Sequence, residues 1–273
     1  MKQKVYYIFV IIILFTSCAK KVDWPLQRGN TNMIIVDGII TGGDTNTIQS
    51  IKLSYPVTQL NAIPMPVSGA TVIISNDNGS YPLTENPANS GIYKTSNDSV
   101  RKPGENYTLL IKYNNINYTA TTTMLPPIIP PQPVQAVQDN NDTLYHINMS
   151  NNYDATNYAM YEILLDWSKN YTNNPDSSAR LLYYTLPTID EGEIFPPSIQ
   201  SVSFPARTRI TEKRYSITLA YAQYIRALLL ETTWQGGEFD TENANLPTNL
   251  SNGAGGFFAA CGVYPLPAFI AHQ

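Results

Sequence analysis

The stretch from residue 106 to residue 123 constrains the fold of this chain most strongly. One face of the first run is lined by Tyr107, Leu109, Ile111 and Tyr113. The return run is lined by Ile116, Tyr118, Ala120 and Thr122, with Asn114-Asn115 between the two runs. A period of two on both sides of a short polar turn predicts an antiparallel β-hairpin. One face of this hairpin is apolar, so other strands or a helix have to cover it.

Similar short runs continue on both sides of this hairpin. Residues 33–40 are almost continuously apolar, as expected for a strand that is covered on both faces. In the turn Asn76-Asp77-Asn78-Gly79, we expect Asn-Gly to supply a positive φ. Further strands are predicted around residues 51–55, 70–74, 91–93, 145–149, 159–167, 181–186 and 215–219. This spacing predicts a mainly β fold, with an antiparallel Ig-like or transthyretin-like sandwich over residues 33–124.

The second half, residues 134–273, is expected to be a second β-rich domain with one helix. Residues 220–235 place an apolar stripe on one helical face, formed by Tyr221, Ile225, Leu228 and Thr232. The pair Gly236-Gly237 is a plausible end for this helix. An amphipathic stripe has to be covered, so we expect the helix to pack across the second sheet.

A proline-rich segment, residues 125–133, separates the two halves. Its sequence Leu-Pro-Pro-Ile-Ile-Pro-Pro-Gln-Pro favours an extended backbone and removes hydrogen-bond donors that a sheet needs. We interpret it as a stiff linker between domains. The alternative is an edge segment that crosses between the two sheets of one domain.

The first 17 residues have the layout of a secretory signal. Lys2 and Lys4 precede an uncharged apolar run over residues 5–15, which Thr16-Ser17 closes. A cationic start, an apolar core of about 7–15 residues and small residues at the cleavage position characterise such signals. A membrane-spanning helix needs about 20 apolar residues, so we expect residues 1–17 to be a signal peptide and not a membrane span.

Cys18 directly follows a small residue, and this pattern resembles the lipobox of bacterial lipoproteins. The resemblance implies cleavage before Cys18, diacylation of its thiol and acylation of the new amino end, with palmitate as an acyl group. Several acyl chains anchor a protein stably, because each buried methylene contributes about 0.8 kcal/mol. Residues 18–32 would then be a lipidated tether. The alternative is an incidental thiol inside an ordinary secretory signal.

Net charge and cysteine content exclude several classes of protein. The formal net charge of −4 becomes about −6 when Lys2 and Lys4 leave with the signal. A mildly acidic chain lacks the basic surface that nucleic-acid binding needs. If Cys18 is acylated, Cys261 has no partner in the chain, which excludes a disulfide framework and a cysteine-ligated metal site. We expect Cys261 to be a small buried hydrophobe.

The sequence offers few catalytic groups. A Ser-His-Asp triad would need His146, which faces away from its strand's apolar side, or the penultimate His272. Glu162 and Asp166 share a strand face, but about 13 Å separates their backbones, against about 5–9.5 Å between the carboxylates of glycosidases. The run Asp190-Glu191-Gly192-Glu193 is expected to be a solvated turn, with calcium binding as the alternative. We expect no enzymatic activity, no cofactor and no metal.

Two groups of residues are candidates for binding a ligand or a partner. The first group is the three tryptophans, since tryptophan side chains stack on sugar rings; they are Trp24, Trp167 and Trp234. The place of Trp167 on an apolar strand face favours core packing instead. A basic cluster is expected to be a solvated hairpin, and the alternative is a surface that faces an acidic receptor loop. The cluster contains Arg207, Arg209, Lys213 and Arg214.

Three spaced motifs in the first half resemble a known β-sandwich module. They are Val67-x-Gly69-Ala70-x-Val72-x-Ile74, Gly91-x-Tyr93 and Gly104-x-x-Tyr107-x-Leu109-x-Ile111. They are similar to the regulatory-like repeats of carboxypeptidases and of TonB-dependent receptor plugs. The resemblance implies glycines at turns, with tyrosines and aliphatic residues in the core, and it implies no chemistry.

The C-terminal part carries a second resemblance. Residues 247–260 contain Gly253-x-Gly255-x-Phe257, preceded by Leu250 in place of a more usual Ile. With the lipobox, the Val67-x-Gly69-Ala70 segment and the strand that Asn157-Tyr158 opens, this ending resembles the Bacteroidetes lipoprotein family called domain of unknown function 4249. The resemblance implies an outer-membrane lipoprotein, often encoded beside a TonB-dependent receptor, with no known activity.

These observations lead to one functional expectation with alternatives. We expect a non-enzymatic outer-membrane lipoprotein, anchored through Cys18, that is an accessory subunit of a TonB-dependent nutrient transporter. The side of the outer membrane that it occupies stays open. The first alternative is a free-standing glycan-binding lipoprotein of the cell envelope, and the second is a hydrolase that uses His146 or Glu162.

Overall fold

The structure is a computed structural model, and Asn32–Gln273 form one compact unit within it. The predicted signal, the tether and Cys18 lie outside the described residues. Among the described residues, no helix is both long and apolar enough to cross a membrane. The structure describes residues 33–43, 48–57, 59, 62–96, 102–130, 133–139, 143–148, 157–169, 177–186, 201–232 and 246–271.

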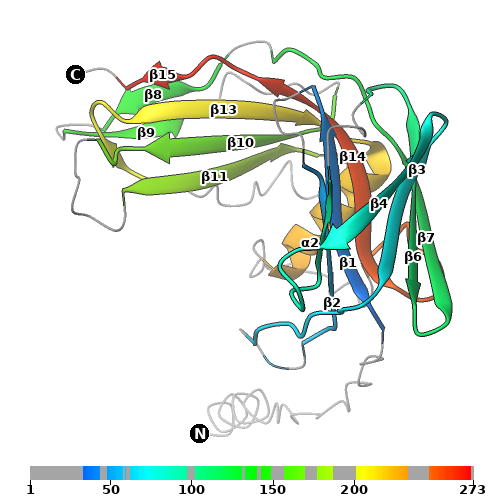
Figure 1. The fold of residues 1–273 in the computed structure, drawn as a ribbon. Helices are drawn as coiled ribbons and strands as arrows, with labels where there is room; N and C mark the ends of the chain where they lie inside the picture. Colours follow the sequence, from blue (N-terminus) through cyan, green and yellow to red (C-terminus); the bar gives the residue numbers. More distant parts are fainter. Residues whose placement is uncertain are drawn as a thin grey trace, which may run out of the picture. The chain divides into compact units, whose positions relative to one another are not determined.

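The first half of the chain contributes seven strands to one large sheet (Figure 1). Their order in the sheet is β1-β2-β5-β4-β3-β6-β7, and each of these neighbouring pairs is antiparallel. The strands are β1 (Ile35–Gly42), β2 (Ser50–Ser54), β3 (Thr71–Asn76), β4 (Gly79–Glu85), β5 (Ile92–Thr95), β6 (Asn106–Tyr113) and β7 (Ile116–Thr123).

A strand from the end of the chain completes this part of the sheet. Strand β14 (Gly255–Pro265) pairs in parallel with β1, from Ile35 opposite Gly255 to Gly42 opposite Gly262. The segment before β14 returns to β7, where Ser251 N donates to Thr119 O at 2.9 Å. The sheet therefore closes on itself from β14 through β7, and it surrounds a core of side chains from all these strands.

The hairpin predicted from the alternating residues is confirmed as β6 and β7. Tyr107, Leu109 and Ile111 are fully buried. The two turn residues, Asn114 and Asn115, have φ values of 49° and 61°, which is the left-handed geometry of a type I′ turn. Asparagine tolerates this region better than most residues, so it suits a two-residue turn.

The turn at Asn76–Gly79 forms differently from our expectation. Neither Asn78 nor Gly79 is among the residues with positive φ. The Asn76 Oδ1 atom instead accepts hydrogen bonds from Asn78 N at 3.0 Å and Gly79 N at 3.1 Å. This side chain closes the turn as an Asx-turn, so no left-handed residue is needed.

On the other side of β14, the sheet continues with strands of the second half. Its order there is β14-β13-β10-β11, and β15 also pairs with β13. All these pairs are antiparallel, so the β1–β14 pair is the parallel one among the described strands. The bounds are β10 (Ala159–Asp166), β11 (Ser178–Thr185), β13 (Arg209–Ser216) and β15 (Phe269–Ile270).

A small three-stranded sheet covers one face of this extension. It consists of β8 (Gln135–Gln138), β9 (Leu144–Asn148) and β12 (Phe204–Pro205), in the order β12-β9-β8. Side chains of this small sheet, such as Tyr145 and Phe204, share a buried cluster with Tyr161 and Ile163 of β10. This second core explains why β10 is apolar on the side that the sequence predicted.

The opposite face of the extension is covered by helix α2 (Leu219–Thr232), the one helix among the described residues. Thr218 precedes the helix, and its hydroxyl accepts a hydrogen bond from Tyr221 N at 3.3 Å, as an N-cap does. Tyr221 and Ile225 are buried together with Phe257 of β14. The predicted stripe is correct in its first half, but Thr232 is exposed. Gly236-Gly237 lies outside the described residues.

The part of the proline-rich segment that the structure describes before residue 131 runs beside β13 and β14, with Ile128 O at Arg214 and Leu125 to Pro127 at Gly262. A Cβ atom added at Gly262 would lie 2.2 Å from Leu125 O, so the two backbones touch. The predicted division into domains at this segment stays a prediction. The two halves share one sheet through β14, and the mainly β fold with a helix is confirmed.

Candidate functional site

A polar cluster links three neighbouring strands of the extension. Glu162 of β10 is only 9% exposed, and both of its carboxylate oxygens accept hydrogen bonds. Oε1 accepts from Arg180 Nε of β11 at 2.6 Å, and Oε2 accepts from the Tyr215 hydroxyl of β13 at 2.7 Å. The Arg180 side chain is 60% exposed, so one side of this buried carboxylate opens to solvent through a guanidinium group.

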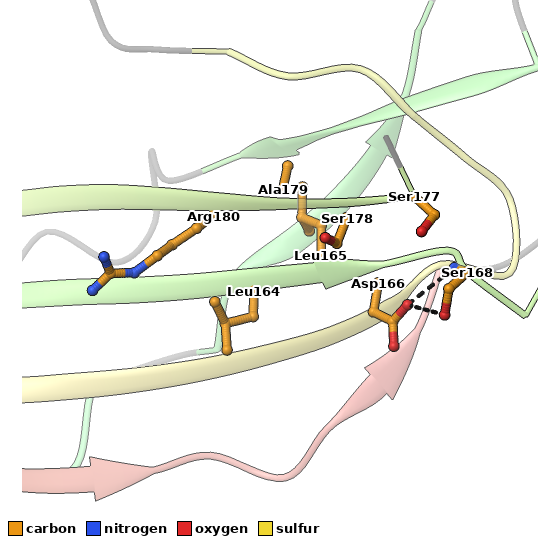
Figure 2. A pocket seen from close by; sticks show the side chains of 8 residues that line it. All are labelled: Leu164, Leu165, Asp166, Ser168, Ser177, Ser178, Ala179 and Arg180. Carbon is orange, nitrogen blue, oxygen red and sulfur yellow. Dashed lines mark hydrogen bonds between the residues drawn. The ribbon is translucent and has the colours of Figure 1, made fainter. Parts of the chain in front are cut away.

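An open hollow of about 480 Å³ begins at the same arginine and follows the ends of β10 and β11 (Figure 2). Figure 2 shows the Arg180 guanidinium and the Asp166 carboxylate toward opposite ends of the hollow, with Leu164 between them. The serine hydroxyls gather toward the Asp166 end, and apolar side chains lie between them and Arg180. The lining residues are Leu164, Leu165, Asp166, Ser168, Ser177, Ser178, Ala179 and Arg180.

Asp166 is held in place by its neighbour in the turn. Its Oδ1 atom accepts from Ser168 Oγ at 2.6 Å and from Ser168 N at 3.0 Å. These two hydrogen bonds stabilise the charged form and lower the pKa of the Asp166 carboxyl. The hollow therefore presents a fixed anion and a cation at separate positions, which suits a ligand that has several hydrogen-bonding groups.

The two carboxylates that the sequence placed on one strand face have different partners. Glu162 binds Arg180 and Tyr215, whereas Asp166 binds Ser168. The acidic run 190–193 lies outside the described residues. Among the residues that the structure does describe, no group of three or more His, Cys, Asp or Glu side chains is placed to hold a metal ion.

His146 lies on β9 and contacts Asp139, which was not among the predicted site residues. Its Nδ1 atom lies 2.5 Å from Asp139 Oδ1, and the other oxygen of Asp139 accepts from Ser203 Oγ at 3.2 Å. In a catalytic triad the serine bonds to the histidine, but Ser203 bonds to the aspartate. His146 was predicted to face away from the apolar side of its strand, and its 35% exposed side chain on β9 agrees with this, while His272 lies outside the described residues.

Cys261 lies in the middle of β14 and is fully buried. Burial in apolar surroundings raises the pKa of its thiol to about 12. The thiol is therefore protonated at neutral pH, and it cannot serve as a nucleophile without a large rearrangement. The prediction of a small buried hydrophobe is confirmed for this residue.

The predicted solvated basic cluster is wrong in one member, because Arg214 is completely buried. Its Nε atom donates to the Tyr161 hydroxyl at 3.2 Å, and its Nη1 atom donates to Ser216 Oγ at 3.2 Å and to Ile128 O at 3.4 Å. Along β13 alternate residues face opposite sides, so Arg214 points inward while Arg209 stays exposed. The arginine thereby links β10, β13 and the proline-rich segment.

Glu212 is a second buried charged residue on the same face of β13, and it was not among the predicted site residues. It is 2% exposed, and its Oε2 atom accepts from Val134 N at 2.9 Å. Its Oε1 atom has no hydrogen-bond partner among the described residues. Burial raises the pKa of this carboxyl, although the Val134 hydrogen bond acts against the shift. Alternate residues of β13 face the same side, so the position of Ile210 in the core was the sequence signal that Glu212 and Arg214 would be buried as well.

Trp167 is partly buried and packs against the core cluster between β10 and the small sheet. This position agrees with the predicted core role. Trp24 and Trp234 lie outside the described residues.

The glycine-rich ending has structural roles that its spacing explains. Gly253 and Gly256 have φ values of 73° and 87°. A Cβ atom at Gly256 would lie 2.0 Å from Val36 O, so only glycine lets β14 approach β1 at this point. Leu250 is buried in the closed core, and Phe257 packs under α2. The motif therefore specifies how β14 enters the sheet.

Comparison with known proteins gives one result at the level of the family. A search of curated proteins found no match. A family model described as "Domain of unknown function (DUF4249)" matches residues 20–264, which is nearly the whole of the described fold. The chain therefore belongs to the DUF4249 family.

Proposed function

We propose that this protein is a lipid-anchored accessory subunit of a TonB-dependent nutrient transporter in the bacterial outer membrane. The observation that carries the proposal is the arrangement of the first 18 residues, where an uncharged apolar run ends in a small residue before Cys18. Membership of the DUF4249 family supports it, because the family resemblance implies a lipoprotein that is often encoded beside such a receptor. The proposed source is a bacterium of the Bacteroidetes.

The chemistry of the described body also favours binding over catalysis. The carboxylate of Glu162 accepts hydrogen bonds from Arg180 and Tyr215. The thiol of Cys261 is completely buried, so a substrate does not reach it. A proposed regulatory-like sandwich over residues 33–124 would supply a rigid scaffold of the kind that receptors use. These features support a protein that holds a partner or a nutrient at the membrane.

Affinity purification from native membranes in mild detergent, followed by mass spectrometry, tests this function. We expect a TonB-dependent receptor in stoichiometric amount with the wild-type chain. The matched control is Cys18→Ala, which should appear in the soluble fraction and lose the receptor. Recovery of the wild-type chain alone, even after cross-linking, would contradict the accessory role.

A glycan-binding lipoprotein is the second candidate, and the hollow beside Arg180 favours it. A guanidinium, a carboxylate and several hydroxyl groups around an apolar floor are groups that bind sugar hydroxyls. In this case Arg180→Ala should abolish the retention of the protein on an insoluble polysaccharide, whereas Arg209→Ala should not. Equal retention of both variants would contradict binding at the hollow.

A further inference from the structure

The segment between β2 and β3 presents apolar side chains to solvent. We call residues 55–66 the apolar loop, of which the structure describes all but residues 58, 60 and 61. Ile63 is 92% exposed, Met65 is 68% exposed and Val57 is 45% exposed. Large side chains with this exposure are unfavourable in water, and a cluster of them marks a surface that contacts another apolar phase.

The backbone holds this loop outward. At its base, Tyr55 N donates to Met65 O at 2.8 Å, and Val67 N donates to Leu53 O at 3.0 Å. Val67 directly after the loop is fully buried, so the strands on both sides are fixed in the closed core. The exposure of Ile63 is therefore a property of the folded loop, because backbone hydrogen bonds pair the two ends of the loop as in a hairpin.

The loop also lacks charge. No Asp, Glu, Lys or Arg occurs between Lys52 and Asp77, and the loop itself contains three prolines. Charged groups are costly to move out of water, and their absence removes this cost for a loop that approaches acyl chains. An uncharged, proline-containing loop with protruding aliphatic side chains has the composition of a segment that enters the boundary between lipid head groups and acyl chains.

The strand register places the loop where the chain enters the fold. Ile35 at the start of β1 pairs with Ser54 at the end of β2, directly before the loop. Figure 1 shows the pale blue segment after β2 at the same end of the sheet as the dark blue start of β1. The preceding tether, residues 18–32, is 15 residues long and reaches at most about 50 Å. An anchor at Cys18 keeps this end of the sheet close to the bilayer.

A further apolar side chain, from the β6–β7 hairpin, belongs to the same end. The Tyr55 hydroxyl lies 2.9 Å from the Tyr113 hydroxyl, which joins the base of the loop to the last residue of β6. Tyr113 pairs with Ile116 of β7, and Ile116 is 43% exposed. Two sites far apart in the sequence thus present aliphatic side chains in one region, and the contact between Tyr55 and Tyr113 joins the two sites.

We propose that the apolar loop inserts into the surface of the membrane to which Cys18 anchors the protein, with Ile63 and Met65 as the inserted side chains. The proposal rests on the lipid anchor of the proposed function. It gives the protein a second contact with lipid, which fixes the orientation of the fold on the membrane. A single tether of 15 residues would leave that orientation free.

Site-specific fluorescence on the full lipidated chain tests the proposal. Ile63→Cys and the control Asp77→Cys, at the exposed turn that ends β3 at the other end of the sheet, are each labelled with an environment-sensitive dye through maleimide. Cys261 is fully buried and does not compete for the label. The proteins are reconstituted into vesicles of phosphatidylethanolamine and phosphatidylglycerol, with or without bromine in the acyl chains.

We expect the emission of the dye at position 63 to shift to shorter wavelength on vesicles and to be quenched by the brominated lipid. The dye at position 77 should show neither effect. Equal behaviour of both dyes on vesicles that retain the protein would overturn the proposal. Shielding of position 63 in native membranes but not in lipid vesicles would also overturn it, and would identify a protein as the occupant.

Failure of the anchor is distinguishable from failure of the loop. In the wild-type chain an acylated Cys18 has no free thiol, so no label should be incorporated. If the wild type takes up one label and does not sediment with vesicles, both the anchor and the insertion are wrong. If the wild type stays unlabelled and bound while position 63 stays in water, only the insertion is wrong.

Discussion

Asn249 pairs with both backbone polar groups of Phe258. Its Oδ1 atom accepts from Phe258 N at 3.0 Å, and its Nδ2 atom donates to Phe258 O at 2.8 Å. The same amide group lies 3.4 Å from Thr121 O of β7. One side chain therefore replaces a missing strand between β14 and β7, at the place where the large sheet closes.

Replacement of Asn249 by alanine should lower the free energy of unfolding by about 1–3 kcal/mol, because two backbone groups of Phe258 lose their partners. Chemical denaturation of the purified protein measures this loss. The control is Asp77→Ala in an exposed turn, for which we expect a change within about 0.5 kcal/mol. Similar stabilities for the two variants would show that Asn249 does not close the sheet.

Gly256→Ala should prevent β14 from docking against β1. The added Cβ atom would lie 2.0 Å from Val36 O, in a backbone with a φ of 87°. Gly253→Ala is the matched control, because Gly253 also has a positive φ but open space around the position of a Cβ. We expect Gly253→Ala to cost about 1–2 kcal/mol and Gly256→Ala to abolish soluble folded protein in an expression assay. Equal yields would contradict the close approach.

Arg214→Lys should destabilise the protein although it keeps the positive charge. A lysine cannot reproduce the planar group that reaches Tyr161, Ser216 and the carbonyl of Ile128 together. The expected loss is about 1–3 kcal/mol, measured by thermal or chemical unfolding. Arg209→Lys on the exposed side of the same strand should change stability by less than about 0.5 kcal/mol. Equal effects would mean that burial of Arg214 is not important for stability.

Glu212→Gln should stabilise the protein increasingly as the pH rises. Burial raises the pKa of Glu212 above the ordinary value of 4.5, so the folded state holds this proton more tightly than the unfolded chain does. The contribution of Glu212 to stability is therefore complete below its unfolded pKa and is lost as the pH rises through its folded pKa. Glutamine removes this loss and keeps an oxygen for Val134 N. Unfolding curves from about pH 4 to about pH 7 measure the difference.

Glu85→Gln should have the opposite pH dependence. Burial alone would raise the Glu85 pKa, but hydrogen bonds from Gly91 N at 2.8 Å and Ser68 Oγ at 2.7 Å outweigh burial, and the pKa is lowered. This stabilisation is present above the unfolded pKa and is lost as the pH falls through the folded pKa. The variant should therefore be less stable than the wild type at neutral pH, and the difference should shrink in acid. If the stability difference from the wild type changed with pH in the same direction for both Glu variants, the environments described for Glu212 and Glu85 would be wrong.

The local parts of the fold were predictable because short segments carry their own signal. The β6–β7 hairpin follows from alternation around Asn114-Asn115, and α2 follows from the stripe that begins at Tyr221. Arg214 was predicted to be solvated because charged residues usually are, and the strand period that turned it inward was outweighed by that expectation. The hollow beside Arg180 was not predictable, because it forms from ends of strands that only pairing brings together.

The class of fold, the position of most strands and the resemblance to the family that the comparison confirmed can be read from the amino-acid sequence. The export and lipidation signals follow from the sequence as predictions. Other features appear only in the folded chain: β14 lies between β1 and β13, Asn249 closes the sheet against β7, and Ile63 and Met65 project at the end where the chain enters. The two kinds of feature differ in how far apart in the chain the interacting residues are. Alternation and turn chemistry act between neighbours, whereas strand partners far apart in the chain are selected by the packing of the complete core.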